Sequence, residues 1–179
     1  MRWRALFADL ESQLDAAQAR DRLADVADLT RAERAGVALV DRLRAHGPEP
    51  LTLVLRDGER VHGRVLDVGP GWLLVADADG PGEHLVPVAA VATVAGLVAA
   101  AAPSPGVVMS RLTLGHALRV VARDRAVVRL RTDAGTLVAR VDAVGRDHLD
   151  AAVVHADSGR PTGERRVVPW SAVLLLSRL

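Results

Sequence analysis

The chain has 179 residues, of which 50% are hydrophobic and 25% are charged, a composition that is ordinary for a globular protein and unlike a disordered tail. It contains no cysteine, which excludes disulfides and thiolate metal sites and points weakly to a reducing, cytoplasmic setting. The formal net charge is only +1, and all 23 basic residues are arginine, which a GC-rich genome explains more simply than selection for guanidinium chemistry.

Residues 1–46 predict a helical hairpin. Apolar residues recur at spacings of three and four, which places them on one stripe that another surface must cover: Trp3, Leu6, Phe7, Leu10, Leu14 and Ala17. Asp9 and Glu11 interrupt this stretch, which argues against a secretion signal. Thr30 and Glu33 match a capping box, so a second helix is expected from Thr30, with one continuous helix as the alternative.

Residues 47–97 predict a first small β unit of five strands. An apolar strand from Leu51 breaks at Asp57-Gly58, a dipeptide that favours a tight hairpin. Gly63 lies inside the next strand, where glycine often marks a bend that lets a short sheet curl toward a barrel. Pro87 cannot donate to a ladder, so its strand is expected to end there or to lie at an edge.

An Ala/Pro linker follows at residues 98–110, and residues 111–179 predict a short helix to about Arg125, capped by Ser110, and five more strands. The stretch from Leu85 to Ser110 has no charged residue and is long enough to span a bilayer. Prolines and a glycine interrupt it, so two short strands and a linker are the better explanation.

The two β units repeat one pattern. "VPVAAVATVAGL" from Val86 returns as "VPWSAVLLLSRL" from Val168, and "RVLDVGPGWLL" from Arg64 returns as "RVDAVGRDHLD" from Arg140. The offset is 76 residues for the second pair and 82 for the first, and the difference of six is expected in the turn at 158–164. Ala139 replaces Gly63, so the second bend is expected to be gentler.

The segment "LTLVLRDGERVHGRVLDVGPGWLLVADADGPGEHLVPVAAVATVAG" resembles the Sm-like small β-barrel family, which includes the Hfq-like RNA chaperones, and a two-barrel group of actinobacterial type. The resemblance implies a mainly β fold with a helical hairpin before two SH3-like, five-stranded barrels, and assembly through strand edges, often with RNA binding. Where Hfq-like proteins carry a Lys-His pair, this chain has Pro87-Val88 and Pro169-Trp170, so that RNA site is not carried over.

Charge is divided unevenly between the two β units. Residues 47–97 hold three arginines and seven acidic residues, a net charge of −4, whereas residues 98–179 hold twelve and seven, a net charge of +5. A basic unit attracts phosphate, and the best contact candidates are Arg119, Arg123, Arg125, Arg129 and Arg131. A solvated helix end and strand face is the simpler explanation of this cluster.

Few other residues suggest a binding site. Trp72 and Trp170 are the tryptophans placed to stack on a base, although a core or interface plug is the better explanation of Trp170. The candidate interface residues are Trp72, Trp170, Leu6, Leu10 and Leu14.

Enzyme signatures are missing from the sequence. The six histidines are scattered, and His148 with Asp147 and Asp150 is explained better by a solvated turn than by a metal site. The Gly-Pro-Gly segments are turns, not phosphate loops, because no Lys-Ser or Lys-Thr follows them. No catalytic residue, metal or cofactor is expected.

The leading hypothesis is a non-enzymatic, cytoplasmic assembly or partner-binding module, which self-associates or binds a protein through sheet edges or the N-terminal helices, with no membrane partner. The alternative is an RNA- or DNA-binding regulator that uses the arginines of the second unit.

Overall fold

The computed structural model describes residues 35–102 and 112–179. Leu6, Leu10 and Leu14, the predicted caps Thr30 and Ser110, and most of the Ala/Pro linker lie outside these ranges. Residues 39–179 form one compact unit. No helix in the described ranges has both the length and the apolar character that a membrane crossing requires.

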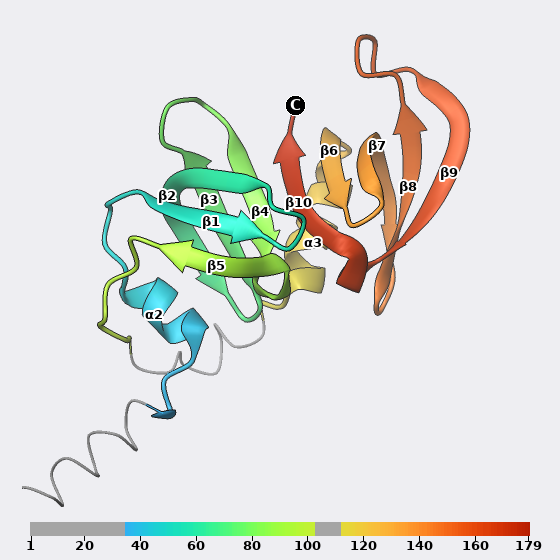
Figure 1. Cartoon of the computed structure of the whole chain (residues 1–179). Coiled ribbons are helices and arrows are strands. Elements are labelled where there is room, and N and C mark those ends of the chain that lie inside the picture. The colour runs from blue at the N-terminus through green and yellow to red at the C-terminus, as the bar shows by residue number, and fades with distance from the viewer. Residues whose placement is uncertain (1–34, 103–111) are drawn as a thin grey trace, which may run out of the picture. The chain divides into compact units, whose positions relative to one another are not determined.

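All ten strands belong to one antiparallel sheet with the order β5-β1-β2-β3-β4-β10-β6-β7-β8-β9 (Figure 1). The first five are β1 (Leu51–Leu55), β2 (Arg60–Gly69), β3 (Trp72–Asp77), β4 (Glu83–Pro87) and β5 (Val91–Ala95). The second five are β6 (Val127–Thr132), β7 (Gly135–Val144), β8 (His148–Val154), β9 (Pro161–Pro169) and β10 (Val173–Arg178). In each unit the fifth strand pairs with the first. The prediction of two five-strand units is therefore confirmed.

A short helix precedes each unit: α2 (Leu39–Ala45) contacts β2, and α3 (Leu114–Asp124) contacts β7. In α2, Val40 and Leu43 pack on the first core, as the apolar spacing predicts. Gly36 to Ala38 are not helical, so the helix expected from Thr30 does not continue unbroken into α2. In α3, Thr113 takes the N-cap position, and Arg125 closes the helix in the left-handed region at φ 50°.

Strand register shows how closely the units match. The ladder between β2 and β3 is irregular between Val65 and Asp67, and the ladder between β7 and β8 is irregular between Val141 and Ala143, 76 residues later. A 3-10 turn precedes the last strand of each unit, η1 (Val88–Ala90) and η3 (Trp170–Ala172), 82 residues apart. The offsets read from the sequence therefore relate equivalent positions in space.

The extra six residues of the second unit lie in a hairpin. The β3–β4 ladder ends at Ala76 and Glu83, whereas Val154 pairs with Pro161 at the far end of the β8–β9 ladder. The insertion predicted for the turn at 158–164 therefore lengthens β9 as well as the loop, because added residues in a hairpin can continue to pair.

The predicted closure into two barrels is wrong, because the structure has one open sheet. A barrel would need β5 to pair with β4 and β10 to pair with β9. Instead, within residues 35–102 and 112–179, β5 pairs with β1 alone, and β10 takes the place beside β4. Pro87 ends β4 as expected, but β4 is an internal strand and not an edge.

Two hydrophobic cores lie against this sheet, and both draw on β10. Leu174 and Leu175 belong to the first core, which the first unit otherwise builds with α2. Val173 and Leu176 belong to the second core. One strand thus stabilises both units, which makes them parts of one folded body.

Candidate assembly interface

The two units meet where the fourth strand of the first pairs with the fifth strand of the second. Leu85 of β4 lies opposite Leu176 of β10, and His84 lies opposite Ser177. The ladder is short, so side chains supply most of the contact. Leu85 and Trp72 of the first unit are buried in the second core, and Leu174 and Leu175 of the second unit are buried in the first.

A chain of hydrogen bonds crosses this junction. His84 Nδ1 lies 2.8 Å from Ser177 Oγ, and His84 Nε2 lies 2.7 Å from Asp77 Oδ1. The three residue types are those of a catalytic triad, but Ser177 lies in a strand that pairs on both sides, unlike the exposed turn that carries a hydrolase nucleophile. The arrangement satisfies the buried Ser177 hydroxyl at the junction.

Ion pairs join the same two units at one end of the junction. Arg131 of β6 binds Asp57 and Glu59 in the β1–β2 turn, with 3.1 Å between Arg131 and Glu59. Arg56 donates to the carbonyl of Ser171 over 2.8 Å. Burial acts to raise the pKa of Asp57, but the hydrogen bonds from Arg131 and from backbone amides, together with the charge of Arg131, outweigh it and hold this pKa below its usual range. Asp57 is therefore ionised, and its charge attracts the basic second unit.

Among the described residues, strands equivalent to β4 and β10 lie at the two ends of the sheet, each paired on one side. β9 is the fourth strand of the second unit, and β5 is the fifth strand of the first. Val167 of β9 is equivalent to Leu85, yet its exposed fraction is 67%, compared with 7% for Leu85. Val94 of β5 is equivalent to Leu176. One end of the sheet therefore presents a strand equivalent to β4, and the other end presents a strand equivalent to β10.

The sequence motifs do not predict the junction, but the composition of β10 does carry a signal for it. Residues 173–176 are four consecutive buried apolar residues, whereas β5, at the equivalent place, contains Ala92 and Thr93, both exposed. A strand that is apolar on both faces is typical of the middle of a covered sheet. This contrast predicts that β10 is internal and β5 is not.

The structure places the arginines of the predicted cluster on α3, at its C-terminal end and on β6. Arg131 is held in the ion pairs of the junction. Arg119 and Arg123 line a groove beside α3, Arg125 lines a different pocket, and Arg129 is exposed on β6. The five residues are therefore spread over the helix, the junction and the strand face.

Trp72 is buried in the second core, and Trp170 is partly buried against it. Trp72 is 8% exposed, and its Nε1 donates to the carbonyl of Leu112 over 2.6 Å. Trp170 packs on the second core and lies so close to Gly115 of α3 that a Cβ there would meet its ring at 2.6 Å. The ring of Trp72 is therefore not presented as a stacking platform.

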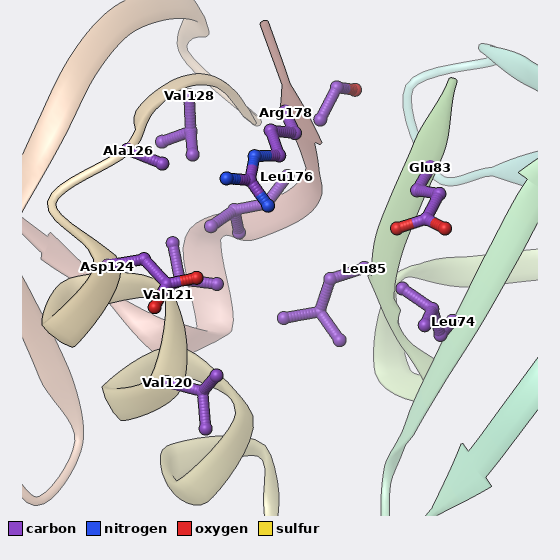
Figure 2. Close-up of a pocket in the computed structure, with 11 residues that line it drawn as sticks. Leu74, Glu83, Leu85, Val120, Val121, Asp124, Ala126, Val128, Leu176 and Arg178 are labelled. Carbon is purple, nitrogen blue, oxygen red and sulfur yellow. The ribbon is translucent and has the colours of Figure 1, made fainter. Parts of the chain in front are cut away.

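An apolar groove runs between α3 and strands β3 and β4. Figure 2 shows its narrow part, about 190 Å³, where Val120 and Val121 of α3 face Leu85 and Leu74 of the strands. A wider part of about 600 Å³ continues toward Trp72 and shares these four residues. Because Val120 is 59% exposed, the groove offers an apolar surface across the junction.

The candidate metal residues do not gather around a common point. His148 Nδ1 lies 2.8 Å from Asp147 Oδ1, in the turn before β8. Within residues 35–102 and 112–179, no three His, Cys, Asp or Glu residues are placed to hold one ion.

The chain shows no similarity from which a family follows. No protein-family model matches it, and searches of curated proteins and of solved structures gave no significant match.

Proposed function

We propose that this protein is an assembly module whose copies join end to end, with β9 of one copy beside β5 of the next. On this proposal each unit is Sm-like in its assembly as well as in its strand order. The observation that supports it is the junction inside the chain, because β4 and β10 already make the contact that β9 and β5 would repeat.

Equivalent residues give the register of the proposed contact. Leu85 and Leu176 are opposite each other in the junction, so Val167 of one copy would lie opposite Val94 of the next. Arg166, equivalent to His84, would lie opposite Ala95, equivalent to Ser177. His84 is polar and still pairs with β10, so the polar Arg166 is compatible with pairing of β9.

The charges of the two ends favour the contact. The β5 end belongs to the unit with a net charge of −4, and the β9 end belongs to the unit with +5. Such a contact is head-to-tail, so it builds either a closed ring or an open filament. Ala92 and Thr93 stand where the junction has Leu174 and Leu175, so less apolar surface is buried and the association is expected to be weaker than the junction.

Sedimentation velocity of the full chain over a range of protein concentrations tests the proposal. We expect species larger than a monomer that increase with concentration, and we expect Val167→Glu to shift the distribution to monomer, because it places a carboxylate in the contact. Leu66→Glu is the matched control, since Leu66 is 51% exposed on the internal strand β2. A strict monomer at every concentration, or equal behaviour of the two variants, would overturn the proposal.

A further inference from the structure

Three arginines of the second unit line one pocket of about 380 Å³. Arg125, Arg140 and Arg165 share it with Ala122, Val141 and Asp142. Only Arg125 belongs to the cluster that the sequence singled out. The pocket is separate from the apolar groove and from the junction, with which it shares no lining residue.

Strand register explains why these side chains converge. Arg140 of β7 pairs with Ala152 of β8, and Ala152 pairs with Arg165 of β9. Directly paired residues point to the same face of a sheet, so the two arginines flank a small alanine that leaves space between them. α3 contacts β7, and Arg125 is the residue that closes this helix. The third guanidinium therefore reaches the pocket from the helix end.

The positive charge of the pocket is not neutralised. None of the three arginines has a carboxylate of the described residues within ion-pair distance, 4 Å. Asp142 contributes one negative charge, and the C-terminus of α3 contributes about half of one. The three positive charges of the guanidinium groups exceed this negative charge, so the pocket attracts an anion.

One donor in the pocket lacks an acceptor. The Nε atom of Arg140 is buried and has no hydrogen-bond partner among the described residues. Buried donors are almost always paired, because burial removes the water that would otherwise accept from them. A ligand oxygen that entered the pocket would satisfy this atom.

We propose that the pocket of Arg125, Arg140 and Arg165 binds the phosphate group of a small phosphorylated molecule. Phosphate oxygens match the planar, forked donors of arginine, and such charge-assisted hydrogen bonds are among the stronger ones in proteins. The volume exceeds that of one phosphate group and leaves room for the part of the ligand to which it is attached.

Isothermal titration calorimetry of the full chain with pyrophosphate at low ionic strength tests the site, with chloride at matched ionic strength as the reference. Arg125→Gly suits the left-handed backbone at φ 50°, and Arg165→Gln changes an exposed side chain that has no carboxylate of the described residues within 4 Å, so both variants are expected to fold. Each is expected to weaken pyrophosphate binding by about tenfold or more, as the loss of a charge-assisted hydrogen bond implies. Arg129→Gln, an exposed arginine of β6, is the control and should leave binding unchanged.

The outcomes separate a built site from general charge and from nucleic acid. Equal losses in Arg129→Gln and Arg165→Gln, or no binding above chloride, would overturn the site. A second titration uses a single-stranded RNA oligonucleotide, and binding of RNA without binding of pyrophosphate would overturn the assignment to a small molecule. Val167→Glu, which alters the proposed end-to-end contact, is expected to bind pyrophosphate normally, so a failure of assembly is distinguished from a failure of this site.

Discussion

Equivalent residues in the two units differ in burial according to what lies beside them. Leu85 is buried because β10 covers its strand, whereas Val167 occupies the same place in β9 and is exposed. Trp72 and His148 begin β3 and β8, and each ring lies against the glycine three residues earlier, Gly69 or Gly145. The local conformation is therefore repeated even where the side chain has changed.

Gly63 is needed for a close approach between strands. A Cβ at this position would lie 2.1 Å from the carbonyl oxygen of Ala76. The irregularity of the ladder lies further along, and β7 has the same one with Ala139 in place of the glycine. This irregularity of the ladder therefore does not require a glycine at the position of Gly63.

Gly63→Ala is expected to lower the free energy of unfolding by about 1–3 kcal/mol, because the backbone of β3 must shift to admit the methyl group. Chemical denaturation measures this change. Gly47→Ala is the control, since a Cβ at Gly47 meets no atom within 4 Å, and its effect should stay within about 0.5 kcal/mol. Equal stability of Gly63→Ala and the original chain would contradict the close approach.

At the scale of elements, local signals predicted the strands and could not predict which strands pair across the units. The Asp57-Gly58 turn, the glycine turns before Trp72 and His148, and the matching Val-Pro segments place all ten strands. Pairing between β4 and β10 joins residues far apart in the sequence, such as Leu85 and Leu176, which are 91 positions apart, and no turn encodes it. The expectation of closed barrels failed for this reason.

Which residues share a site could be predicted only in part, because strands distant in the sequence bring them together. The sequence identified arginines by their closeness along the chain, which groups Arg125 with Arg129 and Arg131. The structure groups Arg125 with Arg140 and Arg165, which come from separate strands. The sequence predicts sheet edges as the contact surface, and which two strands lie at the ends of the sheet follows only from the order of its strands.

β10 is expected to control the stability of the first unit although it belongs to the second. Leu175 is 8% exposed and lies in the first core. Leu175→Ala should lower the free energy of unfolding by about 2–5 kcal/mol, because it removes buried methyl groups and leaves a cavity. Thr93→Ala, the equivalent change in the exposed strand β5, should cost about 0.5 kcal/mol or less.

Thermal and chemical unfolding of the two variants provides the measurement, followed by amide hydrogen exchange. In Leu175→Ala, the amides of β3 and β4 should lose protection together with those of β6. Loss of protection confined to β6 through β9 would mean that β10 does not stabilise the first unit.

At the scale of the whole molecule, the chain contains one copy of a contact, and on the proposed function the two ends of its sheet would make that contact again. β4 and β10 form the contact within the chain, and β9 and β5 are the corresponding strands at the ends of the sheet. The acidic first unit and the basic second unit give these ends opposite charge. The strand arrangement follows from a repeat whose copies are joined head to tail, whereas the difference in charge is a difference between the two copies.

Disulfide cross-linking of introduced cysteines tests most directly whether copies of the chain repeat the contact between β4 and β10. The experiment is simple because the chain has no cysteine of its own. Directly opposed residues on paired strands have Cα atoms about 4.5–5.5 Å apart, within the range of a disulfide. Leu85→Cys with Leu176→Cys is the positive control and should form a bond within one chain, since these residues are opposed in the junction. Val167→Cys with Leu66→Cys is the negative control, because Leu66 lies on the internal strand β2.

The decisive variant carries Val167→Cys and Val94→Cys and is analysed by non-reducing electrophoresis after mild oxidation. The account predicts a ladder of covalently linked multiples of the chain, absent from the negative control and removed by reductant. Only monomer, or the same products as the Val167→Cys and Leu66→Cys chain, would contradict it.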